Sequence, residues 1–276
     1  MPLPPVSRPV HALRVYARLL VAGVRRQSSY PLATLAGLVA NATFGLLKTG
    51  ILLAAVGSAG GTLAGYDVGT MSAYVWLSQG LLGSVNLWGG SDMMQRIRSG
   101  DVAIDFLRPV DVQGAAIATD VGKGLFALLP RGLPSVLIGV LAVGVTMPAT
   151  PGPYVLGVFS VLVGITVSHA LVYLLAVTGF WLVETRGVTV LYMSVSGLFA
   201  GLFTPVWLFP DWLRTAAEAT PFPSMMMYPI DVLTGRVTGA DAVGVVGVQL
   251  AWLAGVLLLG HVLTRAGRRT LEVQGG

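Results

Sequence analysis

The sequence has little charge and no cysteine. Of its 276 residues, 11% are charged and 54% are apolar, whereas about 25% of the residues in a soluble domain are charged. A soluble chain of this length needs a charged coat, which this composition does not provide. The absence of cysteine excludes disulfide bonds and thiolate metal sites. Most of the surface must therefore face a lipid bilayer, and we predict an all-α integral membrane protein that forms a single transmembrane domain over residues 1–276.

The sequence also lacks the motifs of common catalytic and metal sites. Its nearest approach to a phosphate-binding loop, Gly122-Lys123-Gly124, has Ile117 in place of the first required glycine and a glycine in place of the hydroxyl residue. His11, His169 and His261 are scattered and have no second ligand at metal-binding spacing. We therefore expect that the chain is not an enzyme and binds no cofactor or metal of its own.

Long apolar stretches predict the transmembrane helices. A spanning helix needs about 20 mostly apolar residues, and six stretches qualify. They are Leu32–Val56, Thr70–Gly89, Leu125–Met147, Tyr154–Val183, Val188–Leu208 and Ala242–Leu263.

The cations indicate the orientation, because positive residues collect on the cytoplasmic side of membrane proteins. Only Arg214 and Arg236 lie in the connections of one side, and Lys48 and Arg131 lie inside predicted spans. This split predicts that both termini are cytoplasmic, and it explains the net charge of +5 without a nucleic acid partner. The cations of the other side are Arg8, Arg14, Arg18, Arg25, Arg26, Arg96, Arg98, Arg108, Lys123, Arg186, Arg265, Arg268 and Arg269.

The leader, residues 1–31, has the pattern of an amphipathic helix. Its apolar residues recur at steps of three and four, with arginines on a neighbouring stripe. We expect this helix to lie flat at the cytoplasmic interface, with its arginines among lipid phosphates. It would serve as a topology anchor or as an elbow helix that transmits motion. The apolar stripe consists of Val6, Val10, Leu13, Ala17, Leu20 and Val24.

Two connections are longer than a turn requires. In the cytoplasmic segment, residues 90–114, Ser91 or Asp92 can cap a short helix that ends at Gly100. The outer segment, residues 204–241, holds five prolines among aromatic residues and three consecutive methionines. It is too apolar for a free loop, so we predict a broken, re-entrant hairpin of short helices before the last span.

Polar side chains inside the predicted spans are few. Asn41, Gln79 and Asn86 are interpreted as interhelical contacts in preference to substrate contacts. His169 is interpreted as a packed, hydrogen-bonded side chain rather than a proton relay. The predicted spans carry no mid-span carboxylate, which argues against a carrier driven by protons or sodium ions.

One segment carries a family resemblance. The residues Ile97–Asp111, IRSGDVAIDFLRPVD, are similar to a motif of bacterial ABC permeases, and Phe209-Pro210, Thr220-Pro221 and Leu233-Thr234-Gly235 match the proline-rich outer region of the same family. Over its whole length the chain resembles the permeases of the type 2 family of ABC exporters. The nearest subgroup is a bacterial one whose operons often pair two different permeases with one ATPase.

This resemblance implies a function and a site. The chain would be a permease subunit in the bacterial plasma membrane, and it would form a translocation path with a second permease, identical or different. ATP and Mg²⁺ would bind to partner ATPase subunits. The substrate would be a small amphiphile, and membrane lipids would surround the complex.

The resemblance also assigns residues to these roles. The ATPase would contact the cytoplasmic segment, with Ile97 and Phe106 as apolar anchors. The residues assigned to this contact are Met93, Arg96, Ile97, Arg98, Asp101, Asp105, Phe106 and Arg108. The path would lie between the second and fifth spans of the two permeases, and its candidate lining residues are Asn41, Gln79, Asn86, Phe199 and Phe203.

Two alternatives stay open. A secondary transporter or lipid-handling protein without an ATPase would show inverted repeats and mid-span acids, and neither is evident. A structural membrane anchor would show no substrate-dependent activity with any partner. The drug-exporting branch of the family often has a charged residue after the outer tyrosine, but here Tyr228 is followed by Pro229-Ile230. The sequence therefore does not identify the substrate.

Overall fold

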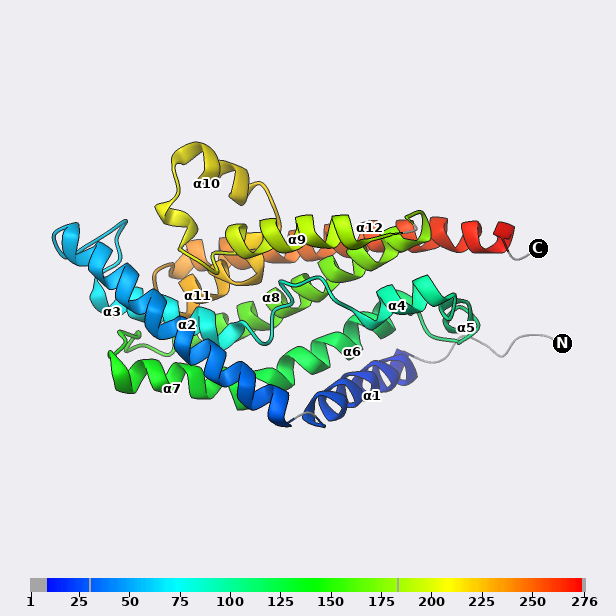
Figure 1. Ribbon diagram of the computed structural model, residues 1–276, viewed down its shortest axis with the longest axis horizontal. Helices are drawn as coiled ribbons and strands as arrows, with labels where there is room; N and C mark the ends of the chain where they lie inside the picture. Colours follow the sequence, from blue (N-terminus) through cyan, green and yellow to red (C-terminus); the bar gives the residue numbers. More distant parts are fainter. Residues whose placement is uncertain (1–8, 30, 183, 275–276) are drawn as a thin grey trace.

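The computed structural model describes residues 9–29, 31–182 and 184–274. In these residues the chain is helical, and the only strand-like pairing is an isolated bridge between Leu63 and Tyr66. This confirms the all-α class. The helices form an elongated bundle in which the described beginning and end of the chain lie at the same end of the long axis (Figure 1). We call this the terminal end and the opposite one the distal end.

Four helices are long and apolar enough to cross a membrane. They correspond to the first, third, fourth and last predicted spans. The third is a composite, because a π-helical turn, η1 (Leu128–Gly132), joins α6 to α7 without a break. The four are α2 (Pro31–Ser58), α6–η1–α7 (Val112–Ala127, Leu128–Gly132 and Leu133–Ala142), α8 with η2 (Gly152–Val177 and Thr178–Phe180) and α12 (Gly239–Gln274).

The second and fifth predicted spans form shorter helices. The helices α3 (Val68–Leu81) and α9 (Arg186–Phe199) have 14 residues each, which is about 21 Å of helix against a hydrocarbon core of about 30 Å. The prediction of continuous helices over 70–89 and 188–208 is therefore not supported. Both stretches stay apolar beyond the helix end, so composition alone gave no sign that the helix stops.

The helices α3 and α8 form the inside of the bundle. Ten residues of α3 are buried, and 61% of the most apolar window of α8 is buried, against 22–28% for the other three candidate spans. The indole of Trp76 on α3 fills a slot between two glycines, because a Cβ at Gly139 would lie 2.1 Å from its ring and one at Gly45 would lie 2.7 Å away. Most of the large exposed apolar side chains of the described residues lie on α2, α7, α12 and one face of α8, where lipid would cover them.

The distal end carries a chain of short helices between α9 and α12. They are separated by prolines, and Met225, Met226 and Met227 are at most 1% exposed. Buried Asp231 accepts hydrogen bonds from Trp207 Nε1 at 2.8 Å and from the Tyr66 hydroxyl at 3.3 Å. This network ties the segment to the connection between α2 and α3. The short helices are η3 (Val206–Leu208), α10 (Asp211–Glu218), η4 (Phe222–Met225) and α11 (Met227–Leu233).

The leader forms a helix, α1 (Pro9–Ser28), but it packs along α6 (Figure 1). A Cβ at Gly23 would lie 2.0 Å from the Thr119 carbonyl oxygen, and one at Gly122 would lie 2.1 Å from the Leu20 carbonyl oxygen. The two backbones therefore touch at these glycines. One face of the leader is therefore covered by α6, and its placement flat at the cytoplasmic interface stays a prediction.

The apolar stripe predicted for the leader does not form the contact with α6. Leu13 is 72% exposed and Ala17 is exposed, whereas Gly23 is buried. The contact with α6 follows the small residue rather than the large apolar ones, because backbone contact between helices requires glycine. Val6 and Val10 lie outside the part of the chain whose side chains are described.

Candidate functional site

The segment between α3 and α6 forms two short helices at the terminal end (Figure 1). The first, α4 (Asp92–Ser99), is capped by Ser91, whose hydroxyl accepts from the Met94 amide at 3.2 Å, and it ends at Gly100, where φ is +82°. These are the cap and the stop that the sequence predicts. The second, α5 (Val102–Asp105), follows directly. This segment contains the eight residues assigned to the ATPase contact.

Three apolar residues of the segment face the interior of the same chain. Met93, Ile97 and Val102 are 7%, 6% and 0% exposed and pack in a cluster with residues of α8 and α12. The ring of Phe106 stacks on Phe180 at 6.3 Å between centroids, and the Arg268 guanidinium lies over the Phe106 ring at 5.5 Å from its centroid. Ile97 and Phe106 therefore hold the segment on the bundle in this conformation, which does not favour their predicted use as anchors for a partner.

Other residues of the segment are open to a partner. Ile104 and Leu107 are 55% and 85% exposed, and Arg98, Asp101 and Arg108 are also exposed. Large exposed apolar side chains beside exposed charges are typical of a protein contact surface. We call Arg98, Asp101, Ile104, Leu107 and Arg108 the exposed coupling surface.

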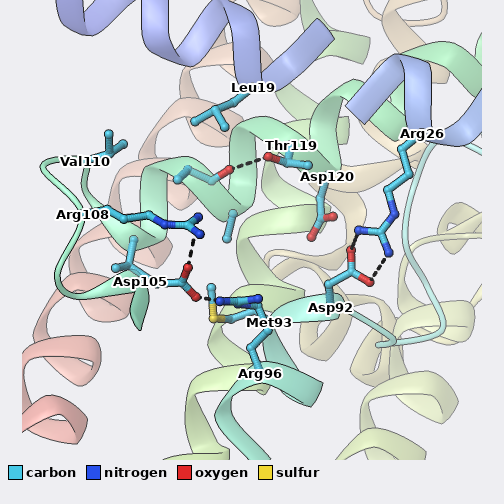
Figure 2. A pocket seen from close by; sticks show the side chains of 13 residues that line it. Leu19, Arg26, Asp92, Met93, Arg96, Asp105, Arg108, Val110, Thr119 and Asp120 are labelled. Carbon is cyan, nitrogen blue, oxygen red and sulfur yellow. Dashed lines mark hydrogen bonds and ion pairs between the residues drawn. The ribbon is translucent and has the colours of Figure 1, made fainter. Parts of the chain in front are cut away.

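Asp105 joins the two short helices. Its carboxylate accepts from Arg96 Nε at 2.5 Å and lies 3.4 Å from Arg108 Nη1. Arg96 also donates to the Asp101 carbonyl at 3.2 Å. The hydrogen bond to Asp105 raises the pKa of Arg96. Arg96 and Asp105 therefore act inside the segment and fix its shape (Figure 2).

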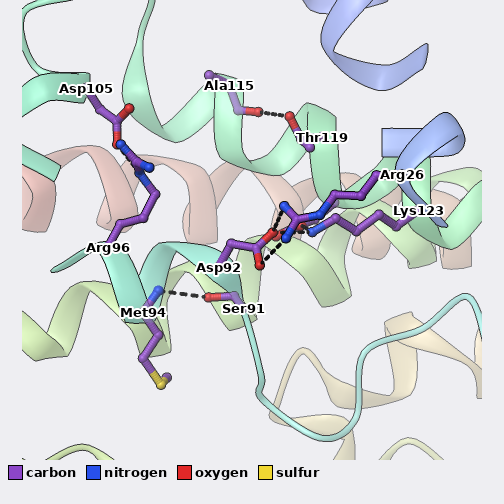
Figure 3. A network of polar contacts seen from close by, with 10 residues as sticks. Arg26, Ser91, Asp92, Met94, Arg96, Asp105, Ala115, Thr119 and Lys123 are labelled. Carbon is purple, nitrogen blue, oxygen red and sulfur yellow. Dashed lines mark hydrogen bonds and ion pairs between the residues drawn. The ribbon is translucent and has the colours of Figure 1, made fainter. Parts of the chain in front are cut away.

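Asp92 joins the segment to two other helices. Its carboxylate accepts from Arg26 of α1 at 2.6 and 3.2 Å and from Lys123 of α6 at 2.7 Å. Lys123 also donates to Asp120 at 2.7 Å. Burial of Asp92 opposes its ionisation, but Lys123 and Arg26 outweigh this effect and lower its pKa. Figure 3 shows Arg26 and Lys123 converging on this carboxylate.

A pocket of about 270 Å³ lies between α1, the two short helices and α6. Arg26, Asp92, Arg96, Asp105 and Arg108 line it in ion pairs, and Leu19 and Val110 supply apolar wall (Figure 2). All five of these charges have partners within the chain. The pocket offers no unpaired charge to a ligand.

The five residues predicted to line a path fall into separate groups. Buried Asn41 donates to the Gln79 carbonyl at 2.9 Å, so these two form an interhelical contact. Asn86 accepts from the Trp88 and Gly89 amides and thereby stabilises the turn after α3. Phe199 packs edge-on against Phe222. Phe203 is 60% exposed.

The helix α9 contacts the extended chain after α3 rather than α3 itself over much of its length. Ser196 donates to the Leu87 carbonyl at 2.9 Å, and Tyr192 donates to the Asn86 carbonyl at 2.8 Å. These side chains satisfy backbone groups that a continuous helix would have paired internally. Their roles were not predicted, because serine and tyrosine in an apolar stretch carry no sign of a backbone partner 106 or 109 residues away.

Two cations inside the spans were not assigned a role from the sequence. Lys48 of α2 donates to Ser78 Oγ at 3.0 Å and to the Leu202 carbonyl. Arg131 lies in the π-helical turn, where its Nη2 donates to Asn41 Oδ1 at 3.4 Å. The sequence did mark both positions as unusual, because a cation in an apolar stretch costs free energy in the membrane.

Comparison with known proteins places the chain in context. A family model described as ABC-2 family transporter protein matches residues 45–275. None of the curated proteins matches the chain. The matched range includes both short helices of the segment at the terminal end and all four candidate spans except the first part of α2.

Proposed function

The chain belongs to the ABC-2 transporter family, and we propose that it is the transmembrane permease subunit of an ATP-driven exporter. It would form the translocation path with a second permease, and separate ATPase subunits would hydrolyse ATP. The observation that carries this proposal is the family match over residues 45–275, which includes the exposed coupling surface. The exporting direction and a bacterial inner membrane location are parts of the proposal.

In this proposal the terminal end faces the cytoplasm. The thirteen cations of one side support this orientation. The helices α3 and α9 would contribute the second and fifth crossings, α3 as a short helix continued by extended chain and α9 as a short helix followed by a turn. Such backbone is tolerated at membrane depth where protein covers it, and the hydrogen bonds from Ser196 and Tyr192 to the chain after α3 are of this kind.

The ATPase would bind the exposed coupling surface. Ile104 and Leu107 take over the anchor role that the sequence assigned to Ile97 and Phe106, since the latter two are occupied within the chain. Arg98 and Arg108 would pair with carboxylates of the partner. The cluster of Met93, Ile97 and Val102 would pass a displacement of the segment to α8 and α12. The pairs of Asp92 would pass it to α1 and α6.

Alternating access requires that ATP binding favours one arrangement of the permeases over another. A displacement of α4 and α5 by the ATPase would be transmitted through packed contacts rather than through a flexible loop. The ion pair between Arg26 and Asp92 supports the role of an elbow for the leader helix, in addition to that of a topology anchor.

The experiment is a detergent purification of the tagged chain from cells that express its native gene cluster, followed by an ATPase assay. We expect an ATP-binding subunit to co-purify, and we expect Arg98→Glu with Arg108→Glu to uncouple hydrolysis from transport while the protein stays folded. Arg14→Glu, an exposed arginine on α1, is the matched control. Purification of the chain alone or with partners that lack ATPase activity would refute the ATP-driven mechanism and favour the alternative, a secondary transporter or lipid-handling protein.

The orientation has a separate test. The chain has no cysteine, so single cysteines can be introduced without a background. A cysteine at Leu107 should react with a membrane-impermeant maleimide only after the cells are opened, and one at exposed Trp212 on α10 should react in intact cells. The reverse pattern would refute the proposed orientation.

A further inference from the structure

A second cavity lies at the end of α1 and the start of α4. Its volume is about 470 Å³, and its walls come from the end of α1, the extended chain after α3, α6 with η1, and α8. Its lining is rich in polar side chains, among them Asn86, Asp120, Lys123, Arg131 and His169. A cavity lined by this many polar side chains is unusual inside a membrane protein and indicates that a polar group of a ligand enters it.

Arg131 of η1 is part of the lining of this cavity. It is 11 residues from the distal end of the composite helix that ends at Ala142, which is about 16 Å along the axis. Its contact Asn41 lies ten residues from the start of α2, also about 15 Å along that helix. Arg131 is therefore close to the middle of a hydrocarbon core about 30 Å thick.

No carboxylate of the described residues compensates the charge of Arg131. It forms no ion pair with any carboxylate in the ranges 9–29, 31–182 and 184–274. Its Nη2 makes the long contact with Asn41 Oδ1, and its buried Nε has no hydrogen-bond partner in the same ranges. A guanidinium at this depth normally pairs with an anion.

The other charges of the cavity are compensated. Lys123 lies between Asp92 and Asp120 at 2.7 Å from each, and Asp92 also binds Arg26. Both carboxylates of the lining are thus held by cations on the same side of the cavity. The unpaired charge that remains to a ligand is positive, and it belongs to Arg131.

The surrounding backbone makes room for this guanidinium. A Cβ at Gly37 of α2 would lie 2.5 Å from its central carbon, and one at Gly83 would lie 3.3 Å from it. The π-helical turn, which is common at functional sites, carries Arg131 between Pro130 and Pro134. Glycines on two neighbouring segments and an irregular turn in the helix of Arg131 itself therefore make room for this one side chain. An arginine that only set the orientation of the chain in the membrane would not need such a site.

Two further groups in the lining lack partners. Ser84 Oγ and His169 Nδ1 are buried without hydrogen bonds in the described ranges. His169 Nε2 lies 3.2 Å from the Ser84 carbonyl, which only accepts, so Nε2 carries the proton and neutral Nδ1 is an acceptor. If a phosphate or carboxylate of a ligand pairs with Arg131, Ser84 Oγ and His169 Nδ1 remain available to hydrogen-bond a hydroxyl or amide of the same ligand.

We infer that this cavity binds the anionic head group, a phosphate or carboxylate, of an amphiphile that enters from the terminal end, with Arg131 as its counter-ion. In naming a substrate class, the inference rests on the proposed function. The exposed ring of Trp88 (54%) lies at the same cavity and offers an apolar surface beside the polar one. The alkyl part of the ligand would lie along it toward the lipid.

The test is direct binding to the full chain, purified in a neutral maltoside detergent with the partners that accompany it. Dodecyl phosphate is the anionic probe, dodecyltrimethylammonium the cationic probe of equal chain length, and inorganic phosphate the head group alone. We expect the wild-type protein to bind dodecyl phosphate at least tenfold more tightly than either of the others. We expect Arg131→Gln to weaken that binding at least tenfold, and Arg131→Lys to retain most of it. Arg214→Gln, at the distal end, is the control that should leave binding unchanged.

Equal binding of dodecyl phosphate by wild type and Arg131→Gln would overturn the inference, as would equal binding of the two amphiphiles by the wild-type protein. Competition by inorganic phosphate as strong as that by dodecyl phosphate would also overturn it and assign the cavity to free anions. If Arg131→Gln does not fold, the wild-type preference between the two amphiphiles and the binding of Arg131→Lys decide. The binding measurement needs no ATPase, so it can fail independently of the proposed function. If binding depends on Arg131 but no ATPase co-purifies, the proposed function is refuted and the binding site still stands.

Discussion

Arg26 of α1 donates two hydrogen bonds to Asp92 of α4, at 2.6 and 3.2 Å, across 66 residues of sequence. Lys123 of α6 donates to the same carboxylate at 2.7 Å. One acidic side chain therefore connects the leader, the segment that we assign to the ATPase contact, and the composite spanning helix. The leader is part of the same mechanical unit as the coupling segment.

This connection has a defined dependence on pH. Because the pKa of Asp92 is lowered from 3.8 in the folded chain, its ion pairs contribute stability above that value, and the contribution is lost as the pH falls through the lower, folded value. We expect the wild-type protein to be more stable than Asp92→Asn by a constant amount between about pH 8 and pH 5 and by a shrinking amount below about pH 4. Thermal unfolding of both proteins across this range measures it.

The size of this effect should be modest. The Asp92 and Arg26 side chains are 41% and 58% exposed, so solvent screens their interaction, and we expect roughly 1 kcal/mol or less. Asp211→Asn, which removes an exposed carboxylate on α10, is the control. A difference between the wild-type protein and Asp92→Asn that grows as the pH falls below 4 would contradict the assignment.

The crossing of α1 and α6 should not tolerate a side chain at its centre. A Cβ at Gly122 would lie 2.1 Å from the Leu20 carbonyl oxygen, so Gly122→Ala must push the two helices apart. We expect a disulfide between cysteines placed at Leu20 and Thr119 to form readily in the wild-type background and poorly with Gly122→Ala. Gly50→Ala, where a Cβ meets nothing within 4 Å, should not change the yield. Equally low yields in all three backgrounds would show that α1 does not pack on α6 in the membrane, and equally high yields would show that the crossing tolerates a side chain at Gly122.

Residues of the coupling segment separate into two classes by substitution. Ile97→Ala empties a buried site and should destabilise the fold by about 2–5 kcal/mol, because Ile97 is 6% exposed. Ile104→Ser with Leu107→Ser removes exposed side chains and should leave the melting temperature nearly unchanged while it reduces ATPase co-purification. Thermal unfolding and co-purification from the native gene cluster measure the two effects. Loss of the partner with Ile97→Ala at unchanged stability would instead restore Ile97 as the anchor.

The extent of what the sequence predicts differs among these elements. The short helix from Ser91 to Gly100 was predictable because its cap and stop are local signals. The ends of α3 and α9 were not, because Leu87 and Leu202 are as apolar as helix residues and only their backbone partners Ser196 and Lys48 reveal that the helix has ended. Pairing between residues more than 100 positions apart has no local signal.

The same limit applies to the site. Charge at positions 98 and 108 indicated a contact surface, whereas periodicity could not distinguish apolar residues that face a partner from those that face α8. Ile97 and Ile104 are seven residues apart, and they are 6% and 55% exposed. The difference arises because Gly100 ends α4 and α5 begins in a new direction. A turn of this kind resets the helical phase, so a single stripe drawn through the whole segment misassigns its second half.

Substitution of Lys48 should weaken a contact between three parts of the chain. Lys48 donates to the Leu202 carbonyl and to Ser78 Oγ, and so it joins α2, α3 and the turn that follows α9. Gly201, the neighbour of Leu202, has a φ of +82°, and its carbonyl accepts a hydrogen bond from the Tyr74 hydroxyl at 2.8 Å. Lys48→Met keeps the length and apolar stem of the side chain and leaves the Leu202 carbonyl without this donor, which should cost about 1–3 kcal/mol.

We expect the loss to appear as a local opening of the turn after α9 before global unfolding. A cysteine at Thr204 should react faster with a small maleimide in Lys48→Met than in the wild-type background, and the melting temperature should fall by only a few degrees. Lys48→Arg retains a donor, so the reactivity at this position should stay closer to that of the wild-type background. An unchanged reactivity in Lys48→Met would contradict this role of Lys48. It would mean that the packing around Tyr74 and Gly201 holds the turn without the lysine.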